Sequence, residues 1–230
     1  MLLILMIIVP VILFIIYTGI YYHADQTALN ALKSDNTVTV TKTDQGWFFD
    51  GPSDTDILIF YPGGKVEETA YAPLLHTLAG AGMDAYLVKM PFRLAVFGIN
   101  KAESIMERYS YDDWYIGGHS LGGAMAASYA ADNGDDLSGL ILFAAYPVKK
   151  LDDNLIGLSI YGSEDGVLNM DKYFAGDEFA PKNHEEYRIE GGNHAGFGNY
   201  GEQSGDGAAA ISAEEQQDLA VEFIIGSIYK

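Results

Sequence analysis

The stretch that decides the fold reads IGGHSLGG and runs from Ile116 to Gly123. The apolar residues directly before it are typical of a buried strand, and the alanine-rich residues directly after it are typical of a helix. A serine at such a sharp strand-to-helix turn has a strained backbone, so the positions two before and two after it must be small. Gly118 and Gly122 meet that need. The pattern predicts that Ser120 is a nucleophile exposed at the edge of a sheet; a glycine-rich turn with an incidental serine is the alternative.

Buried strands and helical patterns alternate along most of the chain, which is typical of a parallel sheet covered on both faces. The expected strands are residues 57–61, 85–89, 114–117, 139–143, 155–161 and 186–189. The expected helices are residues 71–81, 98–109, 121–133, 168–174 and 213–228. Earlier in the chain, residues 37–41 and 47–49 flank a glycine turn and predict a β-hairpin. The expected fold class is therefore α/β, with a mostly parallel sheet and an N-terminal hairpin.

Composition narrows the possible functions. The chain has 230 residues, a formal net charge of −19 and no cysteine. Its length fits one domain with a sizeable core. The negative charge would repel nucleic-acid phosphates, and the lack of cysteine excludes disulfides and thiolate catalysis. We therefore expect no nucleic-acid partner; the oligomeric state is left open.

The N-terminal segment is strongly apolar. Residues 2–16 carry no polar side chain, and the run continues to Ile20 before Tyr21 and Tyr22. About 20 such residues span a bilayer, and tyrosines suit its interface. Residues 1–22 are therefore predicted to be an uncleaved transmembrane anchor that holds the domain outside the cytoplasm, with a cleaved signal and a secreted protein as the alternative. Residues 23–36 would then be a connector and residues 37–230 the globular domain.

A nucleophilic serine needs a base to accept its proton. Ligands of parallel sheets bind at the C-terminal edge. His194 directly follows the last expected strand and lies at that edge, whereas His184 precedes the same strand at the opposite edge. His119 is expected to point away from its neighbour Ser120. The sequence therefore favours His194 as the general base.

The base in turn needs a carboxylate to orient it. Asp165 lies in the polar turn that follows the expected strand 155–161, and Gly162 allows that turn to swing back. Glu164 in the same turn remains a possible substitute, and Asp152 and Asp153 are less favoured. The chain order serine, aspartate, histidine is the order expected for an α/β hydrolase.

The oxyanion of the reaction needs two N–H donors. One is expected from Leu121, the residue after the nucleophile. The other should come from the loop YPGGKV at residues 61–66, whose glycines permit close approach of a substrate. Gly64 and Lys65 are both candidates, and the sequence does not distinguish them.

Four motifs together resemble the α/β-hydrolase superfamily, and within it the small lidless dienelactone-hydrolase-like proteins of bacteria, membrane-anchored or exported. They are YPGGKV at 61–66, the serine turn, GSEDG at 162–166, and GGNHAGFGNYG at 191–201 continuing through Gln203 to residues 205–207. The resemblance implies an α/β-hydrolase fold, no cofactor and no metal. Ser120 stands where dienelactone hydrolases have cysteine, so their substrate is not carried over.

The expected reaction is cleavage of an ester or thioester through an acyl-enzyme. The link at residues 146–154 is short, which predicts that no cap domain covers the site. Residues 90–97 are expected to form an apolar wall for a small or lipid-like acyl substrate, or alternatively to pack on the core. Acyl transfer by the same residues and a catalytically silent surface binding protein are the other functions that the sequence leaves open.

Overall fold

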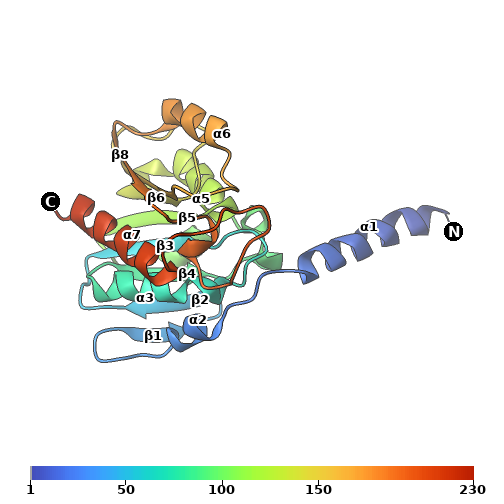
Figure 1. The fold of residues 1–230 in the computed structure, drawn as a ribbon, viewed down its shortest axis with the longest axis horizontal. Helices are drawn as coiled ribbons and strands as arrows, with labels where there is room; N and C mark the ends of the chain where they lie inside the picture. The colour runs from blue at the N-terminus through green and yellow to red at the C-terminus, as the bar shows by residue number, and fades with distance from the viewer. Residues whose placement is uncertain (1) are drawn as a thin grey trace.

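The computed structural model describes residues 2–230, which fold around one eight-stranded sheet (Figure 1). The strand order is β1-β2-β4-β3-β5-β6-β7-β8. The strands are β1 (Thr39–Lys42), β2 (Gly46–Asp50), β3 (Asp56–Tyr61), β4 (Asp84–Val88), β5 (Asp113–His119), β6 (Gly139–Phe143), β7 (Ile156–Gly162) and β8 (Asn183–Ile189). The hairpin β1-β2 joins the sheet antiparallel to β4, and the other neighbours pair in parallel. The predicted mostly parallel sheet with an N-terminal hairpin is confirmed.

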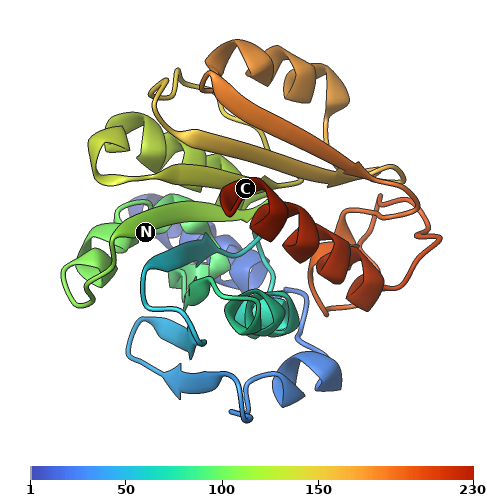
Figure 2. The same ribbon diagram turned by 90° about the vertical axis from the view of Figure 1, so that its left-hand side faces the viewer.

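Helices cover both faces of this sheet. They are α2 (Gln26–Asn30), α3 (Ala72–Gly80), α4 (Lys101–Met106), α5 (Leu121–Asp132), α6 (Met170–Ala175) and α7 (Ala213–Ile228). The short 3-10 helices are η1 (Glu68–Tyr71), η2 (Pro91–Arg93), η3 (Ala95–Phe97), η4 (Gly134–Asp136), η5 (Gly176–Phe179) and η6 (Ala195–Phe197). Figure 2 shows α3 and α7 together on one face. The helices predicted over 71–81, 98–109, 121–133, 168–174 and 213–228 correspond to α3, α4, α5, α6 and α7.

The core follows from the two-residue repeat of the strands. Successive side chains of β3 point to opposite faces of the sheet. Leu58 and Phe60 belong to the apolar cluster that includes residues of α3 and α7, whereas Ile57 and Ile59 belong to the cluster that includes residues of α4 and α5. A strand buried on both faces must be apolar at every position, which explains the uninterrupted run ILIF in β3.

The N-terminal segment forms helix α1 (Leu2–Gly19), which projects from the domain (Figure 1). Among residues 2–230, no helix combines the length and the apolar character needed to cross a bilayer. The prediction of a membrane anchor is therefore wrong, and so is the localisation that was inferred from this anchor.

Tyrosines that we expected at a membrane interface contact the folded domain instead. The Tyr17 ring lies 4.3 Å from Nζ of Lys65, and the Tyr21 ring lies 3.4 Å from the guanidinium of Arg93. The Tyr22 backbone N–H donates to the carbonyl oxygen of Lys65. The sequence pattern misplaced these tyrosines because it does not reveal which surface their rings contact.

The link between β6 and β7 is short and carries no helix within the described residues 144–155. Large lids over α/β-hydrolase sites are usually inserted in this link. The expectation of a fold without a cap domain at this position is confirmed.

Candidate active site

Ser120 occupies a sharp turn between β5 and α5. Its backbone has φ +54° and ψ −121°, in the left-handed half of dihedral space that non-glycine residues avoid. Such strain costs about 1–3 kcal/mol and persists only where the surroundings enforce it. A Cβ at Gly118 would lie 2.4 Å, and one at Gly122 2.1 Å, from the carbonyl oxygen of Tyr61, so both positions must be glycine. The Ser120 residue is partly exposed.

The structure brings Asp165 and His194 together. Oδ2 of Asp165 and Nδ1 of His194 are 2.8 Å apart, and both side chains are almost fully buried, at 1% and 2% exposure. Asp165 lies after β7 and His194 after β8, at the C-terminal edge of the sheet. The other carboxylate oxygen of Asp165 accepts the backbone N–H groups of Val167 and Leu168, which fixes its direction.

The second ring nitrogen of His194, Nε2, differs from Nδ1 in its hydrogen bonding. Nε2 is buried and has no hydrogen-bond partner within the described residues. Ser120 Oγ likewise makes no hydrogen bond to His194 in the described part of the chain. Catalytic hydrogen bonds are often long before substrate binds, so this geometry is compatible with a base that engages the serine during reaction.

The rival acids and the rival histidine lie in other environments. Glu164 is exposed and accepts a hydrogen bond from the Ser163 hydroxyl. Asp153 forms ion pairs with Lys150 and Lys182, and Asp152 accepts the N–H of Asn154. His184 is the second residue of β8, and its Nε2 is 2.9 Å from the Ser159 hydroxyl oxygen.

The loop after β3 distinguishes the two candidate oxyanion donors. The N–H of Lys65 donates to the carbonyl oxygen of Arg93 at 2.9 Å, so it is not free to bind an oxyanion. The N–H of Gly64 has no acceptor within residues 2–230. Gly64 also lies directly against Leu121, since a Cβ on it would be 2.8 Å from Cδ2 of that leucine. Leu121 is the first residue of α5, where backbone N–H groups have no acceptor inside the helix.

His119 takes part in a buried network that the sequence did not predict. Its ring is 4.4 Å from the His194 ring, between centroids, and its Nδ1 is 2.9 Å from the Tyr71 hydroxyl. The same hydroxyl accepts the N–H of Gly63 at 3.1 Å. Tyr71 and His119 therefore connect the Gly64 loop with the candidate base. No local pattern signals this connection, because Tyr71 and His119 are 48 positions apart.

Burial of His119 predicts a specific pH dependence of stability. Burial first, and His194 second, hold the pKa of His119 well below its ordinary value. The unfolded chain gains a proton on this residue near pH 6.5 that the folded chain does not, so the free energy of unfolding falls as pH falls below about 6.5, by at most about 1.4 kcal/mol per pH unit. We expect His119→Gln to lose less stability between pH 7 and pH 5 than the wild type, measured by urea unfolding. Equal losses in the two proteins would contradict this account.

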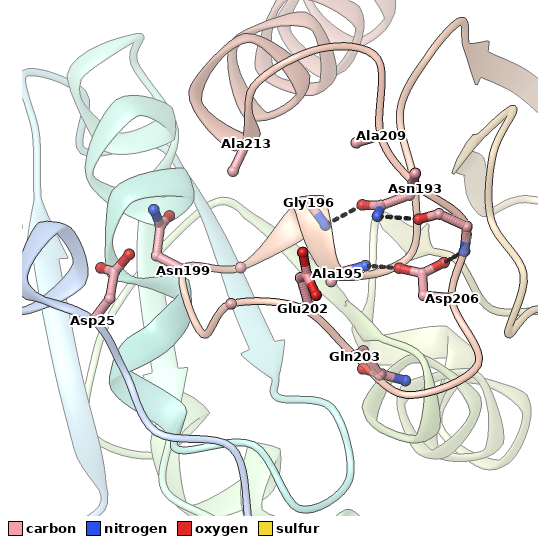
Figure 3. A pocket seen from close by; sticks show the side chains of 14 residues that line it. Asp25, Asn193, Ala195, Gly196, Asn199, Glu202, Gln203, Asp206, Ala209 and Ala213 are labelled. Carbon is pink, nitrogen blue, oxygen red and sulfur yellow. Dashed lines mark hydrogen bonds between the residues drawn. The ribbon is translucent and has the colours of Figure 1, made fainter.

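A hollow of about 530 Å³ lies beside the His194 loop, with Asp25 at one side and Asp206 at the other (Figure 3). Its lining includes Asn193 and Ala195 but neither Ser120 nor His194. No group of three or more acidic or histidine side chains that could hold a metal is found among residues 2–230. From its lining residues, the hollow borders the His194 loop but does not include the candidate nucleophile.

The parallel sheet and the strained serine at the end of β5 define the class of α/β hydrolases. The chain belongs to the alpha/beta hydrolase family, whose model matches residues 57–218. No curated protein sequence matches the chain significantly.

Solved structures with the same fold include several esterases. The chain resembles a CIB-like hydrolase from Thermoplasma acidophilum, with a TM-score of 0.58, 17% identity, and coverage of 82% of this chain and 99% of that one. Est1E from Butyrivibrio proteoclasticus has a TM-score of 0.56 and 16% identity, with coverage of 85% of this chain and 100% of that one. Carboxyl esterase 2 from Tuber melanosporum has a TM-score of 0.57 and 11% identity, with coverage of 90% of this chain and 91% of that one. At these identities the likeness establishes the fold.

Proposed function

We propose that this protein is a serine hydrolase that cleaves carboxylic esters through an acyl-enzyme. The observation that carries the proposal is the buried hydrogen bond between Asp165 and His194, which leaves Nε2 of His194 without a partner among residues 2–230. The strained backbone of the partly exposed Ser120, at the C-terminal end of β5, supports it. A buried nitrogen without a hydrogen bond lowers stability, and a role as general base accounts for this cost at His194.

In the first half-reaction, Ser120 Oγ attacks the ester carbonyl carbon while Nε2 of His194 takes the hydroxyl proton. Asp165 accepts the Nδ1 hydrogen bond and stabilises the resulting imidazolium. The N–H groups of Leu121 and Gly64 stabilise the oxyanion. The C–O bond to the leaving alcohol then breaks, and His194 returns its proton to that alcohol.

The second half-reaction repeats these roles with water. Nε2 of His194 takes a proton from a water molecule that attacks the acyl carbon. The bond to Ser120 Oγ breaks, the serine regains its proton from His194, and the carboxylic acid leaves.

An apolar acyl group suits the surface beside the oxyanion loop. Phe92 and Phe97 are about half exposed and pack edge-to-face with each other and with Phe14 of α1. The hydrogen bond from Lys65 to Arg93 joins their segment to the Gly64 loop. The guanidinium of Arg93 is stacked on the Tyr21 ring. These features, with the uncapped link after β6, fit the small lidless hydrolases that resemble dienelactone hydrolase.

A fluorophosphonate probe tests the proposal on the wild-type chain. We expect one adduct, which mass spectrometry of the digested protein places on the peptide containing Ser120, because the probe phosphonylates activated serines and releases fluoride. Protein unfolded in urea serves as the control and should remain unlabelled. Labelling at another residue, or complete resistance of the folded protein, would refute the proposed nucleophile.

A further inference from the structure

The loop that follows His194 carries one carboxylate with an unusual number of backbone partners. Oδ1 of Asp206 accepts the N–H groups of Gly166 at 3.1 Å, His194 at 3.2 Å and Gly207 at 2.9 Å. Oδ2 accepts the N–H of Ala195 at 2.8 Å. Figure 3 shows the Asp206 carboxylate directed at the turn that contains Ala195. A carboxylate offers about four acceptor positions, and this one accepts four backbone N–H groups, three of them at Oδ1.

These partners belong to two different loops. Gly166 immediately follows Asp165 on the loop after β7, whereas His194 and Ala195 lie on the loop after β8. Asp206 thus joins the backbone beside the candidate acid to the backbone of the candidate base.

Backbone packing around Asp206 is equally close. A Cβ on Gly207 would lie 2.0 Å from the carbonyl oxygen of Glu164, and one on Gly166 would lie 2.6 Å from that of Gly205. Glycine at these positions lets residues 205–207 rest directly on the loop of Asp165. The glycine in the motif Gly205-Asp206-Gly207 that follows Asp206 is therefore needed for this close contact.

Asp165 is already oriented by its own loop, through the N–H groups of Val167 and Leu168. The backbone N–H of His194 donates to Asp206, so the position of this residue depends on the Asp206 carboxylate. Asn193 contributes to holding its own turn, since it accepts the N–H of Gly196 and donates to the carbonyl oxygen of Gly207. Direct backbone hydrogen bonds join the two loops at their bases, from Ser163 to Ile189 and from Glu164 to Gly192. Asp206 extends this connection to the residues beside Asp165 and to His194 itself.

We propose that Asp206 is a positioning residue. By accepting backbone N–H groups from both loops, it keeps Asp165 and His194 within hydrogen-bonding distance of each other. This inference rests on the proposed function, because it concerns the catalytic pair of that reaction. Asp206 acts through its neighbours and does not itself contact the reacting atoms.

The substitution Asp206→Asn tests this role. Asparagine has nearly the same shape, but one of its two terminal positions is an NH₂ group, and at either position that group would face a backbone N–H. We expect the rate of fluorophosphonate labelling, and kcat on p-nitrophenyl acetate, to fall about 10- to 100-fold, as small misplacements of catalytic groups do. KM should change by less than about threefold, because the substrate does not touch this residue. The exposed Asp171 in α6 provides a matched control, and Asp171→Asn should behave as the wild type.

A double substitution separates positioning from general support of the fold. If Asp206 acts through Asp165 and His194, then Asp206→Asn should slow the Asp165→Asn protein by less than about threefold, because coupled residues are not additive. Asp206→Glu keeps the charge but moves it by one methylene, so it should also be slower than the wild type. Circular dichroism at the assay temperature shows whether each variant is folded, and the Glu variant replaces the Asn variant if the latter is not.

The outcomes distinguish this inference from the proposed function. Slow labelling of Asp206→Asn with a non-additive double variant supports the positioning role. Labelling at the wild-type rate, fully additive losses, or wild-type rates in Asp206→Glu would overturn it while the wild-type adduct on Ser120 still upheld the hydrolase. Absence of any wild-type adduct would instead overturn the hydrolase, and the inference with it.

Discussion

Replacing Ser120 with alanine is expected to lower kcat for p-nitrophenyl acetate by about 10⁵- to 10⁶-fold, the loss typical of removing the nucleophile of a serine hydrolase. The substitution removes the oxygen that forms the acyl-enzyme and leaves the remaining residues in place. A residual rate above that in buffer should persist, because Leu121 and Gly64 still offer their N–H groups to the oxyanion. Steady-state kinetics on the purified variant measures the loss.

Ser128 provides a control on the same helix. Its hydroxyl donates to the carbonyl oxygen of Ala124, one turn earlier in α5. Ser128→Ala removes an equal oxygen without touching the site and should retain wild-type kcat. If Ser120→Ala kept most of its activity, another residue would be the nucleophile and the proposed mechanism would be wrong.

Replacing Asp165 with asparagine is expected to reduce kcat by about 10⁴-fold with little change in KM. The buried carboxylate would become an amide, which does not stabilise the protonated imidazole and can hold His194 in the wrong tautomer. The loss should exceed that of Asp206→Asn, because Asp165 contacts the imidazole directly. Comparison of kcat and KM for both variants provides the measurement.

The alternative acids supply the controls for this experiment. Glu164→Gln changes the carboxylate that directly precedes Asp165 in the same turn. Asp152→Asn changes an acid in the link that follows β6. Both should keep activity within about threefold of the wild type, since these carboxylates accept hydrogen bonds from Ser163 and Asn154 and Asp165 is the one paired with the imidazole. A larger loss in Glu164→Gln than in Asp165→Asn would transfer the orienting role to the glutamate.

Much of the fold was predictable because it is encoded in short-range patterns. The apolar run of β3 is long enough and uniform enough to identify a strand buried on both faces. The start of α7 was predictable from Ser212, whose side chain accepts the N–H of Glu215 in the structure. The prediction for the N-terminal segment was wrong, because no helix among residues 2–230 combines the length and the apolar character needed to cross a bilayer.

Part of the candidate site was also predictable. Ser120, Asp165 and His194 each follow a recognisable strand, and parallel strands bring such residues to one edge. The structure brings Asp165 and His194 together, while their catalytic roles remain predictions for the experiments above.

The sequence by itself determined the order of strands and helices, the glycines that a strained Ser120 requires, and the loops from which an acid and a base would come. Only the tertiary structure decided which groups those loops meet. The N–H of Lys65 donates to Arg93, whereas that of Gly64 has no acceptor in the part of the chain that the structure describes. The fold also places His119 against His194 and Asp206 between two loops. The physical reason is that a hydrogen bond depends on atoms within about 3 Å of each other. Periodicity along the chain encodes which face a residue occupies, but not which distant residue it will contact there.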